Sequence, residues 1–422
     1  MGKNIGFVST RFAGTDGVTL ESSKWAEVLR KSNHTCYWFA GELDRNPNRS
    51  MLVPEAHFKD VQNVWINDRI WGKKNRSLEV TDKIHEIKSK LKVHLRAFIS
   101  QYSIDILIVQ NALTIPMQVP LGVALTELIA EMRIPTIAHH HDFYWERTRY
   151  SVNAVGDFIR MAFPPNLHNI EHVVINSAAQ EELALRTGIS STIIPNVLDF
   201  ENPPTINGIK TRKLREFVGL KPEDIMVLQP TRVIQRKGIE HAIELIKELE
   251  DPRYKLVISH EAGDEGFEYA EWLKNDAADQ GVDLRLLNLD IDDPWSSEGS
   301  PGDSEAYTLL DVYPHADFIT YPSLYEGFGN AFLEAIYFKK PMLINRYAIF
   351  VRDIEPQGFD LITMDGFLSQ KNINQVKETL VSPERRQQMV ETNYQIATRH
   401  YSYKVLRKKL NYLLNIFFGL DE

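Results

Sequence analysis

The chain is poor in cysteine and has no long apolar run. Cys36 is the single cysteine among 422 residues, which excludes an internal disulfide and is typical of proteins in a reducing compartment. No apolar run approaches the ~20 residues of a membrane-spanning helix, and the first residues, MGKNIGFVSTRF, lack the apolar core of a signal peptide. These absences predict a cytoplasmic protein, with peripheral membrane contact left open.

An excess of basic residues is absent too. Lys and Arg total 48 against 57 Asp and Glu, so the formal net charge is −9, and a surface that follows nucleic-acid phosphates is not expected. No internal repeat of solenoid period is visible. A length of 422 residues is large for one hydrophobic core and favours two domains of roughly 200 residues each.

Short apolar runs alternate with amphipathic segments along the chain. Segments such as 22–31 and 120–132 have the spacing of apolar residues that is typical of helices. Around them lie five runs with the composition of buried parallel strands: 5–10, 106–111, 134–140, 172–177 and 191–196. This βα repeat predicts a doubly wound α/β domain.

The alternation lapses once and then restarts. Residues 197–220 contain two adjacent prolines and are predicted to form a linker. Residues 290–305, which are acidic and rich in Ser, Gly and Pro, are predicted to form a loop. A second α/β pattern contains a helix over 239–249 and strand-like runs at 225–232, 254–259, 282–289, 316–322 and 341–345, and one or two helices follow Ser382.

We therefore predict two doubly wound, Rossmann-like domains, residues 1–200 and 201–395. Residues 396–422 are predicted to form a C-terminal helix that packs back toward the first domain. Ligands of doubly wound sheets bind beyond the carboxyl ends of the strands. The functional residues are expected just past those strand ends, around a cleft between the two domains.

The stretch YPSLYEGFGNAFLEAIYFKKP, residues 321–341, has a glutamate on each side of a Gly-Phe-Gly turn. The two glycines let the backbone approach a ligand, and the helix that follows offers free N–H groups to an anion. Asn330 is the expected N-cap of that helix, and Glu334 is expected in its first turn. Glu326 and Glu334 would then accept hydrogen bonds from sugar and ribose hydroxyls, with phosphate between them.

Two other interpretations of this stretch stay open. One is an ordinary turn in which Glu334 only favours the helix dipole. The other is a dinucleotide-binding loop, because GFGNAF begins like G-x-G-x-x-G and Arg346 follows the next strand, where a 2′-phosphate would lie. Phe332 takes the place of the third glycine. On that interpretation the chain is an NADP-dependent oxidoreductase.

The run Y-P-S-x-x-E-G-F-G-x-x-x-L-E-A resembles the signature of the family 4 retaining glycosyltransferases, which have the GT-B fold. The resemblance spans nearly the whole chain and implies transfer of a hexosyl group, glucose or mannose, from a nucleoside diphosphate sugar to a hydroxyl acceptor. It places Glu334 on the ribose. It places Glu326 and the amides of the turn on the sugar and phosphates, the turn residues being Gly327, Phe328, Gly329 and Asn330.

Two cations follow another strand end and resemble the family's G-R-x-x-x-x-K-G element. Strand 225–232 ends at Arg232, and Lys237 precedes the next helix, with Thr231 in place of the family's glycine. Both cations are expected to stabilise the departing diphosphate, whereas Arg236 is expected to be solvated. No cofactor is expected and a metal is not required, because these cations and the helix terminus offset the phosphate charge. No sequence feature requires a covalent nucleophile, so front-face attack is expected.

Three histidines stand at the end of strand 134–140. His139 and His141 share a face of a strand, but no cysteine or third ligand accompanies them at zinc spacing, so no metal site is predicted. The family has a histidine here that contacts the donor sugar; His141 matches it best and His140 is the alternative. Trp145 is expected either to line the acceptor side or to pack in the core.

The loop after the first strand contains Gly14, Asp16 and Gly17, where the family places its acceptor or phosphate contact. Asp16 either holds an acceptor hydroxyl or supports the turn, and Asn196, at the crossover between the domains, is expected to be a hinge or cap. Residues 14–21 and 139–147 also resemble a subgroup that includes mannosylglucosylglycerate synthases. The last alternative is a non-catalytic sugar-nucleotide-binding protein on the same scaffold. Neither the nucleotide base nor the oligomeric state is predicted.

Overall fold

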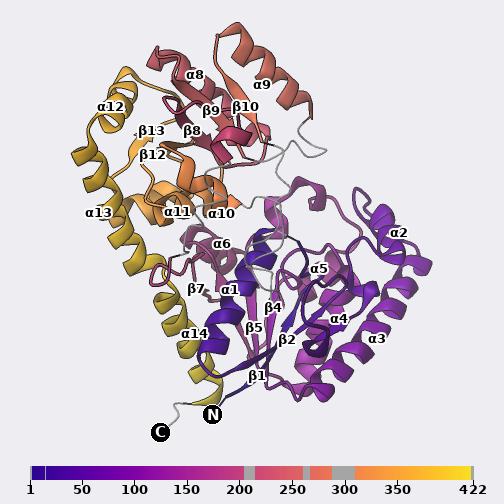
Figure 1. The fold of residues 1–422 in the computed structure, drawn as a ribbon. Helices are drawn as coiled ribbons and strands as arrows, with labels where there is room; N and C mark the ends of the chain where they lie inside the picture. The colour runs from indigo at the N-terminus through magenta and orange to yellow at the C-terminus, as the bar shows by residue number, and fades with distance from the viewer. Residues whose placement is uncertain (1, 15, 204–213, 260–266, 288–308, 420–422) are drawn as a thin grey trace. The chain divides into compact units, whose positions relative to one another are not determined.

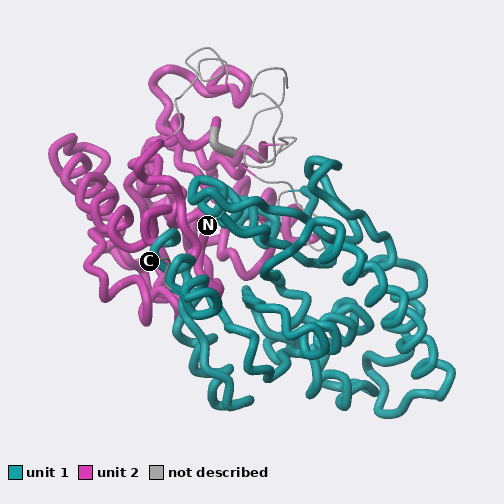
Figure 2. Tube along the Cα trace, turned by 90° about the horizontal axis from the view of Figure 1, so that it is seen from below, with its two compact units in different colours: residues 1–195, 295–299, 406–422 teal, residues 196–294, 300–405 magenta. Residues whose placement is uncertain are grey.

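The computed structural model describes residues 2–14, 16–203, 214–259, 267–287 and 309–419 (Figure 1). It divides into two units, which Figure 2 colours separately. The described residues of unit 1 lie within Met1–Pro195 and Leu406–Glu422, and those of unit 2 lie within Asn196–Pro294 and Ser300–Val405. The sequence prediction places the corresponding boundaries after residues 200 and 395.

Unit 1 contains a seven-stranded parallel sheet with the strand order β3-β2-β1-β4-β5-β6-β7. The strands are β1 (Asn4–Val8), β2 (Thr35–Ala40), β3 (Ser50–Leu52), β4 (Ile106–Gln110), β5 (Thr136–His140), β6 (Ile170–Val174) and β7 (Thr192–Ile193). The helices are α1 (Gly17–Lys31), α2 (Val61–Ile70), α3 (Leu78–Gln101), α4 (Val119–Met132), α5 (Gly156–Ala162) and α6 (Ser177–Thr187). Strand β4 is buried along its whole length, as expected for a parallel strand covered on both faces.

Unit 2 contains a six-stranded parallel sheet with the order β10-β9-β8-β11-β12-β13. The strands are β8 (Ile225–Gln229), β9 (Tyr254–Ile258), β10 (Leu284–Leu286), β11 (Phe318–Tyr321), β12 (Met342–Asn345) and β13 (Ile362–Met364). The helices are α8 (Ile239–Leu249), α9 (Phe267–Asp279), α10 (Leu309–Val312), α11 (Asn330–Tyr337), α12 (Gln370–Val381) and α13 (Pro383–Tyr401). The last helix of the chain, α14 (Tyr403–Phe418), lies from Leu406 onward in unit 1, where Lys409 Nζ donates to the carbonyl of Ile193.

Every strand-like run of the sequence overlaps a strand, and the predicted helix over 239–249 coincides with α8. Strands β2, β3 and β13 were not predicted; two of them have only three residues, too few to show a period. The predicted loop at 290–305 lies outside the described residues, and so do residues 204–213 of the predicted linker. Among the described helices, none is long and apolar enough to cross a bilayer.

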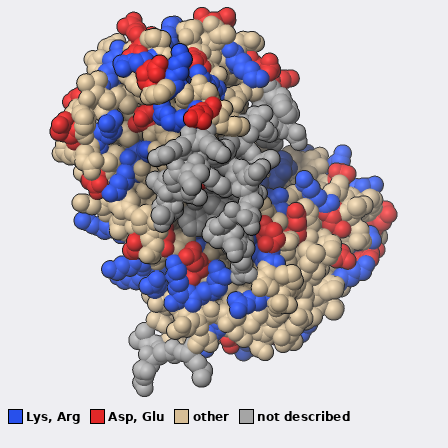
Figure 3. All heavy atoms as spheres, viewed as in Figure 1, with Lys and Arg blue, Asp and Glu red and all other residues tan. Residues whose placement is uncertain are grey.

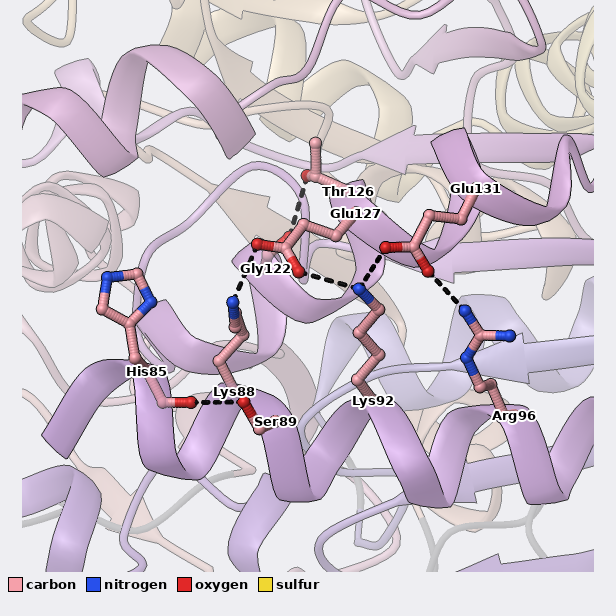
Figure 4. A network of polar contacts seen from close by, with 9 residues as sticks. All are labelled: His85, Lys88, Ser89, Lys92, Arg96, Gly122, Thr126, Glu127 and Glu131. Carbon is pink, nitrogen blue, oxygen red and sulfur yellow. Dashed lines mark hydrogen bonds and ion pairs between the residues drawn. The ribbon is translucent and has the colours of Figure 1, made fainter. Parts of the chain in front are cut away.

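Helices α3 and α4 of unit 1 pack together and carry a network of charges along one side. The buried face of α3 consists of residues at helical spacing: Val80, Ile84, Ile87, Leu91, Leu95 and Phe98. Beside that face, Lys88, Lys92 and Arg96 of α3 reach Glu127 and Glu131 of α4 (Figure 4). We call these five side chains the α3–α4 ion network. On the face shown in Figure 3, basic and acidic side chains are interspersed over both units.

Both sheets share one topological feature. The first strand of each along the chain is central: β1 lies between β2 and β4, and β8 lies between β9 and β11. The strand order therefore reverses between β1 and β4 and between β8 and β11. In doubly wound sheets, ligands bind outside the carboxyl ends of the strands at such a switch point. The loops that follow these four strands are where functional side chains are expected.

Candidate active site

In unit 2 a buried glutamine holds together the two strands that flank the switch point. Gln229, at the end of β8, is fully buried. Its Oε1 accepts from Thr320 Oγ1 of β11 at 2.7 Å, and its Nε2 donates to Thr231 Oγ1 at 2.9 Å. The threonine that replaces the family's glycine therefore has a structural partner, and the loops after β8 and β11 begin from one rigid point.

Across these two loops Glu326 and Lys237 form a buried ion pair. Lys237 Nζ contacts Glu326 Oε1, and Arg236 Nη1 lies 3.4 Å from Glu326 Oε2. Both members of the pair have side chains that are only 10% exposed. Arg236 also donates to the carbonyl of Tyr325 at 2.9 Å. The side chain of Arg236, expected to be solvated, is 40% exposed and also joins one loop to the other.

The protonation states of the pair follow from its surroundings. Burial raises the pKa of Glu326, but the charge of Lys237 and its hydrogen bond lower this pKa by more than burial raises it. The pKa of Glu326 therefore lies below its ordinary value. Burial lowers the pKa of Lys237, and Glu326 only partly offsets this effect. The carboxylate is therefore ionised at neutral pH and is held against a cation in a place poor in water.

Two glycines allow the backbones of this region to pack closely. Gly238 has φ 61°, and a Cβ there would lie 2.6 Å from the carbonyl oxygen of Pro322. Gly329 has φ 106°, and a Cβ there would lie 2.5 Å from the hydroxyl of Tyr347. That hydroxyl donates to the carbonyl of Phe328 at 2.7 Å. A side chain at Gly238 would push the two loops apart, and one at Gly329 would displace the ring of Tyr347.

Helix α11 differs in two details from the sequence prediction. The N-cap is Gly329 rather than Asn330, which is the first helical residue, and no side chain caps the helix. Glu334 is the fifth residue of α11 and so lies in its second turn, not its first. There its Oε2 accepts from Tyr313 Oη at 2.7 Å. Because no side chain occupies the first amides of α11, they remain directed toward a potential anion.

Two arginines separate the alternatives for this region. Arg232 is exposed and has no ion-pair partner among the described residues, and its charge contributes to the lowered pKa of Lys237. Arg346, the proposed 2′-phosphate ligand of an oxidoreductase, binds both oxygens of Glu355, at 2.8 and 2.9 Å, and Asp365 at 3.0 Å. GFGNAF moreover follows the fourth strand of its sheet, not the first. Both facts argue against the dinucleotide interpretation.

At the carboxyl edge of unit 1, the three histidines have different surroundings. The rings of His139 and His141 lie on the same side, with centroids 4.2 Å apart, as predicted. His141 is partly exposed, and its Nε2 forms a hydrogen bond of 2.9 Å with Gln110 Oε1. Burial lowers the pKa of His141 to about 4, although Asp142 and Asp16 oppose the shift. His141 is therefore neutral at pH 7.

His140 points into the interior. Its Nδ1 contacts Thr114 Oγ1, and its Nε2 lies 2.8 Å from His172 Nδ1. With 1% of its surface exposed and both ring nitrogens engaged, His140 has no means of contacting a ligand. Of the two candidates, His141 is the accessible one. His172, which the sequence analysis did not single out, belongs to this buried chain.

The predicted acceptor-side residues have local roles in unit 1. Asp16 caps α1: its Oδ1 accepts from the amides of Val18 and Thr19, and its Oδ2 accepts from Arg11 at 2.8 Å. Asp16 thus supports the turn. Gly17 is the first residue of α1, and Gly14 has open space where a Cβ would lie, with φ 77°.

Two further predicted residues are accounted for by packing and local bonding. Trp145 stacks on Phe143 with ring centroids 4.3 Å apart, beside a small cluster that includes Leu183. Asn196 was expected to be a hinge or cap. Its Nδ2 donates to Asn330 Oδ1 at 2.6 Å. It therefore holds the first residue of α11.

The sequence analysis missed one charged pair near His141. Lys24 Nζ lies 3.1 Å from Glu21 Oε2 on α1, and both side chains are almost fully buried. Their i,i+3 spacing is visible in the sequence, but burial of the pair is not. Across the described part of the chain, no group of three or more His, Cys, Asp or Glu side chains is arranged to hold a metal ion.

Two known proteins are similar to this chain along most of its length, although no protein-family profile matches it. The mannosylglucosylglycerate synthase of Petrotoga mobilis is 33% identical over 387 residues, which cover 85% of this chain and 86% of that protein. The protein of the same name from Thermotoga maritima is 30% identical over 442 residues, which cover 96% of this chain and 98% of that protein.

Solved structures are similar in fold. A glycosyltransferase from Rickettsia africae has a TM-score of 0.67 at 13% identity, with 100% of both chains covered. The sucrose-phosphate synthase of Thermosynechococcus elongatus has a TM-score of 0.65 at 15% identity, with 99% of both chains covered. At such low identity these likenesses bear on the fold alone, which is GT-B. Taken with the identity to the two synthases, they lead to one conclusion: the chain is a glycosyltransferase and belongs to the GT-B family that includes the mannosylglucosylglycerate synthases.

Proposed function

We propose that the chain is a retaining glycosyltransferase that moves a mannosyl group from a nucleoside diphosphate mannose to a hydroxyl of a glucosylglycerate. Mannose is the outermost unit in the product that the names of the two relatives describe. The donor class agrees with the residues that the sequence analysis assigned to unit 2. The unpaired, buried Cys36 fits the cytoplasmic location that is part of the proposal.

The observation that carries the proposal is the buried Glu326–Lys237 pair beside the exposed Arg232. Removing two charges from water costs several kcal/mol per ion, so a buried pair is a poor means of stabilising a fold. Here it lies at the switch point of the sheet, next to a helix start that no side chain caps. Cations and free amides around one strand end are suited to a diphosphate.

In the proposed reaction an acceptor hydroxyl oxygen attacks the anomeric carbon. The bond from that carbon to the phosphate oxygen breaks, its electron pair stays on the phosphate, and the hydroxyl proton passes to the same oxygen. Lys237, Arg232 and the first amides of α11 stabilise the charge that develops on the diphosphate. Attack from the face that the leaving group vacates retains the anomeric configuration.

Glu326 is a poor covalent nucleophile in its observed state. Lys237 contacts one of its oxygens and Arg236 lies near the other, so its negative charge is already neutralised. This supports front-face attack over a glycosyl-enzyme intermediate. Glu326 instead holds Lys237 in place and, through the same carboxylate, accepts from the sugar.

Two further contacts complete the proposal. Glu334, whose carboxylate is oriented by the hydroxyl of Tyr313 at 2.7 Å, accepts from the ribose hydroxyls. His141, neutral at pH 7 because burial lowers its pKa to about 4, forms a hydrogen bond with the transferring sugar. No metal is required, because Lys237, Arg232 and the start of α11 offset the diphosphate charge.

The test is the anomeric configuration of the product. Purified protein, an α-linked nucleoside diphosphate mannose and glucosylglycerate are followed by ¹H NMR, with uridine, guanosine and adenosine donors compared. The proposal expects the α-linked product to form first, with full rate in EDTA. A β-linked product contradicts retention, and a rate that collapses in chelator and returns with Mg²⁺ contradicts the metal-free mechanism. Donor that is bound but neither transferred nor hydrolysed contradicts catalysis.

A further inference from the structure

Unit 1 has a pocket whose residues the sequence analysis did not single out. Its volume is about 190 Å³, room for about six water molecules. Six residues line it: Phe58, Asn67, Trp71, Met117, Arg149 and Tyr150. They belong to the connections that follow β3, β4 and β5. The pocket therefore lies on the carboxyl side of the sheet, the side on which His141 also stands.

The aromatic wall of this pocket is held in place by hydrogen bonds. Trp71 Nε1 donates to Asn67 Oδ1 at 2.9 Å, and the rings of Trp71 and Tyr150 meet edge to face at 4.7 Å. The backbone next to Trp71 is hydrogen-bonded to the opposite loop, because Gly72 N donates to the carbonyl of Val152 at 2.8 Å. The rings are thus fixed before any ligand arrives.

The rim of the pocket is positively charged. The guanidinium of Arg149 lies 4.6 Å above the ring of Tyr150 and is exposed. Lys73 and Lys74, two and three positions after Trp71 in the sequence, are exposed as well. Within the described residues none of these three cations has an ion-pair partner, whereas nearby Arg147 is paired with Asp142. In a chain of net charge −9, unpaired cations around an aromatic pocket favour an anionic ligand.

We infer that this pocket binds the acceptor, a glycoside whose pyranose ring rests on Trp71, which the buried Tyr150 supports, and whose carboxylate is bound by Arg149. Fixed aromatic rings with a few polar groups are typical of small-molecule sites, and the planar guanidinium matches a carboxylate with two parallel hydrogen bonds. A volume of about 190 Å³ is enough for one sugar ring. The inference rests on the proposed function, whose acceptor is a glucosylglycerate.

The experiment compares two acceptors that differ in one group. Glucosylglycerate carries the carboxylate, and glucosylglycerol carries a hydroxymethyl group instead. For the unmodified chain we expect kcat/KM to favour glucosylglycerate by about 10- to 100-fold, the range of a charge-assisted hydrogen bond. Arg149→Gln should reduce that ratio to about 1 by raising the acceptor KM, with the donor KM unchanged, and Arg149→Lys should restore part of it.

Arg69→Gln is the matched control. Arg69 lies on α2 near the pocket and is also an exposed cation, but its guanidinium covers Trp65, 4.1 Å from the ring centroid, and it does not line the pocket. In the Arg69→Gln variant, the ratio of kcat/KM for the two acceptors should equal that of the unmodified chain. If Arg149→Gln keeps the full ratio, or if Arg69→Gln loses it equally, the inference is overturned and the selectivity comes from elsewhere or from net charge.

Acceptor binding without donor separates this inference from the proposed function. Glucosylglycerate should change the tryptophan fluorescence of the intact chain, and Trp71→Phe should remove most of that change. If no transfer occurs but this change is seen and lost in Trp71→Phe, the proposed reaction fails and the pocket stands. If transfer occurs but Trp71→Phe and Arg149→Gln leave acceptor binding intact, the pocket assignment fails alone.

Discussion

Lysine and glutamate meet in both units, but in opposite surroundings. In the α3–α4 ion network of unit 1, the side chain of Lys92 is 19% exposed and that of Glu131 is 45% exposed. In unit 2, Lys237 and Glu326 are each 10% exposed. The first pair joins two helices over a well-packed apolar face (Figure 4). The second joins two loops at a strand end.

The pKa of each lysine shows the difference. Burial lowers the pKa of Lys92, but its contacts with Glu131 and Glu127 raise this pKa by more than burial lowers it, so the net shift is upward. For Lys237, burial outweighs Glu326 and the net shift is downward. The partly exposed network therefore favours its charges at little cost, whereas the site in unit 2 keeps a cation where the surroundings oppose it. Such opposition is typical of functional sites.

Lys237→Met should give the largest effect. It removes the cation that is proposed to stabilise the leaving diphosphate, and it leaves Glu326 buried with only Arg236 near it. We expect kcat to fall by roughly 10³-fold and the free energy of unfolding to fall by about 3 kcal/mol, measured by donor turnover and by urea unfolding. The double variant Lys237→Met/Glu326→Gln serves as the control, since it should regain stability but not activity. Full activity in the single variant would contradict the assignment.

Arg232→Gln should separate catalysis from stability. Arg232 is exposed and has no ion-pair partner among the described residues, so its loss should leave Tm within about 1 °C. Because Arg232 is proposed to stabilise the same diphosphate, kcat should fall roughly 10²-fold. The measurement is turnover together with a thermal scan of the same preparation. Arg253→Gln, which removes an exposed arginine paired with Asp251, is the control and should leave turnover unchanged.

The pH dependence of stability should distinguish the histidines of unit 1 from the pair in unit 2. Burial lowers the pKa of His141 and of His172 to about 4, so between about pH 6.5 and 4 the unfolded chain binds protons that the folded chain does not. Tm should therefore fall as the pH falls through this window. The pKa of Glu326 is lowered from its ordinary value of 4.5, so its contribution begins to be lost only at the acid end of that window and is lost further below it.

His141→Gln should reduce the slope of Tm against pH between 6.5 and 4. His168→Gln is the control because His168 is exposed, and it should leave the slope as in the unmodified chain. An unchanged slope in His141→Gln would show that the burial of that ring does not set its protonation.

Lys92→Met should give the smallest effect. Lys92 contacts Glu127 at 2.9 Å and also Glu131, but Arg96 and Lys88 remain to pair with these carboxylates. Exposed pairs contribute little to stability, so Tm should shift by about 1 °C and turnover should not change. A loss comparable to that in Lys237→Met would end the distinction between the two kinds of ion pair.

Much of the fold could be predicted because its signals are local. Buried parallel strands such as β4 and β8 are short apolar runs, and α8 has apolar residues at helical spacing, so each is visible without its neighbours. Strands β3 and β13 were missed because three residues show no period. The N-cap of α11 was misplaced by one residue, since Gly329 with φ 106° begins the helix without a side-chain cap.

The candidate site was predicted in composition but not in its contacts. Glu326 and Lys237 were both named from their motifs, yet no spacing rule pairs residues 89 positions apart. From the sequence Arg346 was a candidate phosphate ligand, but in the structure its guanidinium is bound to Glu355. For Asp16 and Trp145 the sequence left two roles open, and the structure shows capping by Asp16 and stacking by Trp145, while their acceptor-side roles stay predictions. The aromatic pocket was missed because its residues come from three separate connections.

The sequence by itself determined the alternation of strands and helices, the two-sheet architecture and the family signature around Glu326 and Glu334. These depend on the periodicity of apolar residues and on short motifs, and both are properties of neighbouring residues. Only the tertiary structure decided that Lys237 meets Glu326 out of water, that His141 and not His140 is accessible, and that Arg149 has no ion-pair partner among the described residues. Burial and charge pairing depend on which distant segments meet, and a one-dimensional pattern does not contain that information.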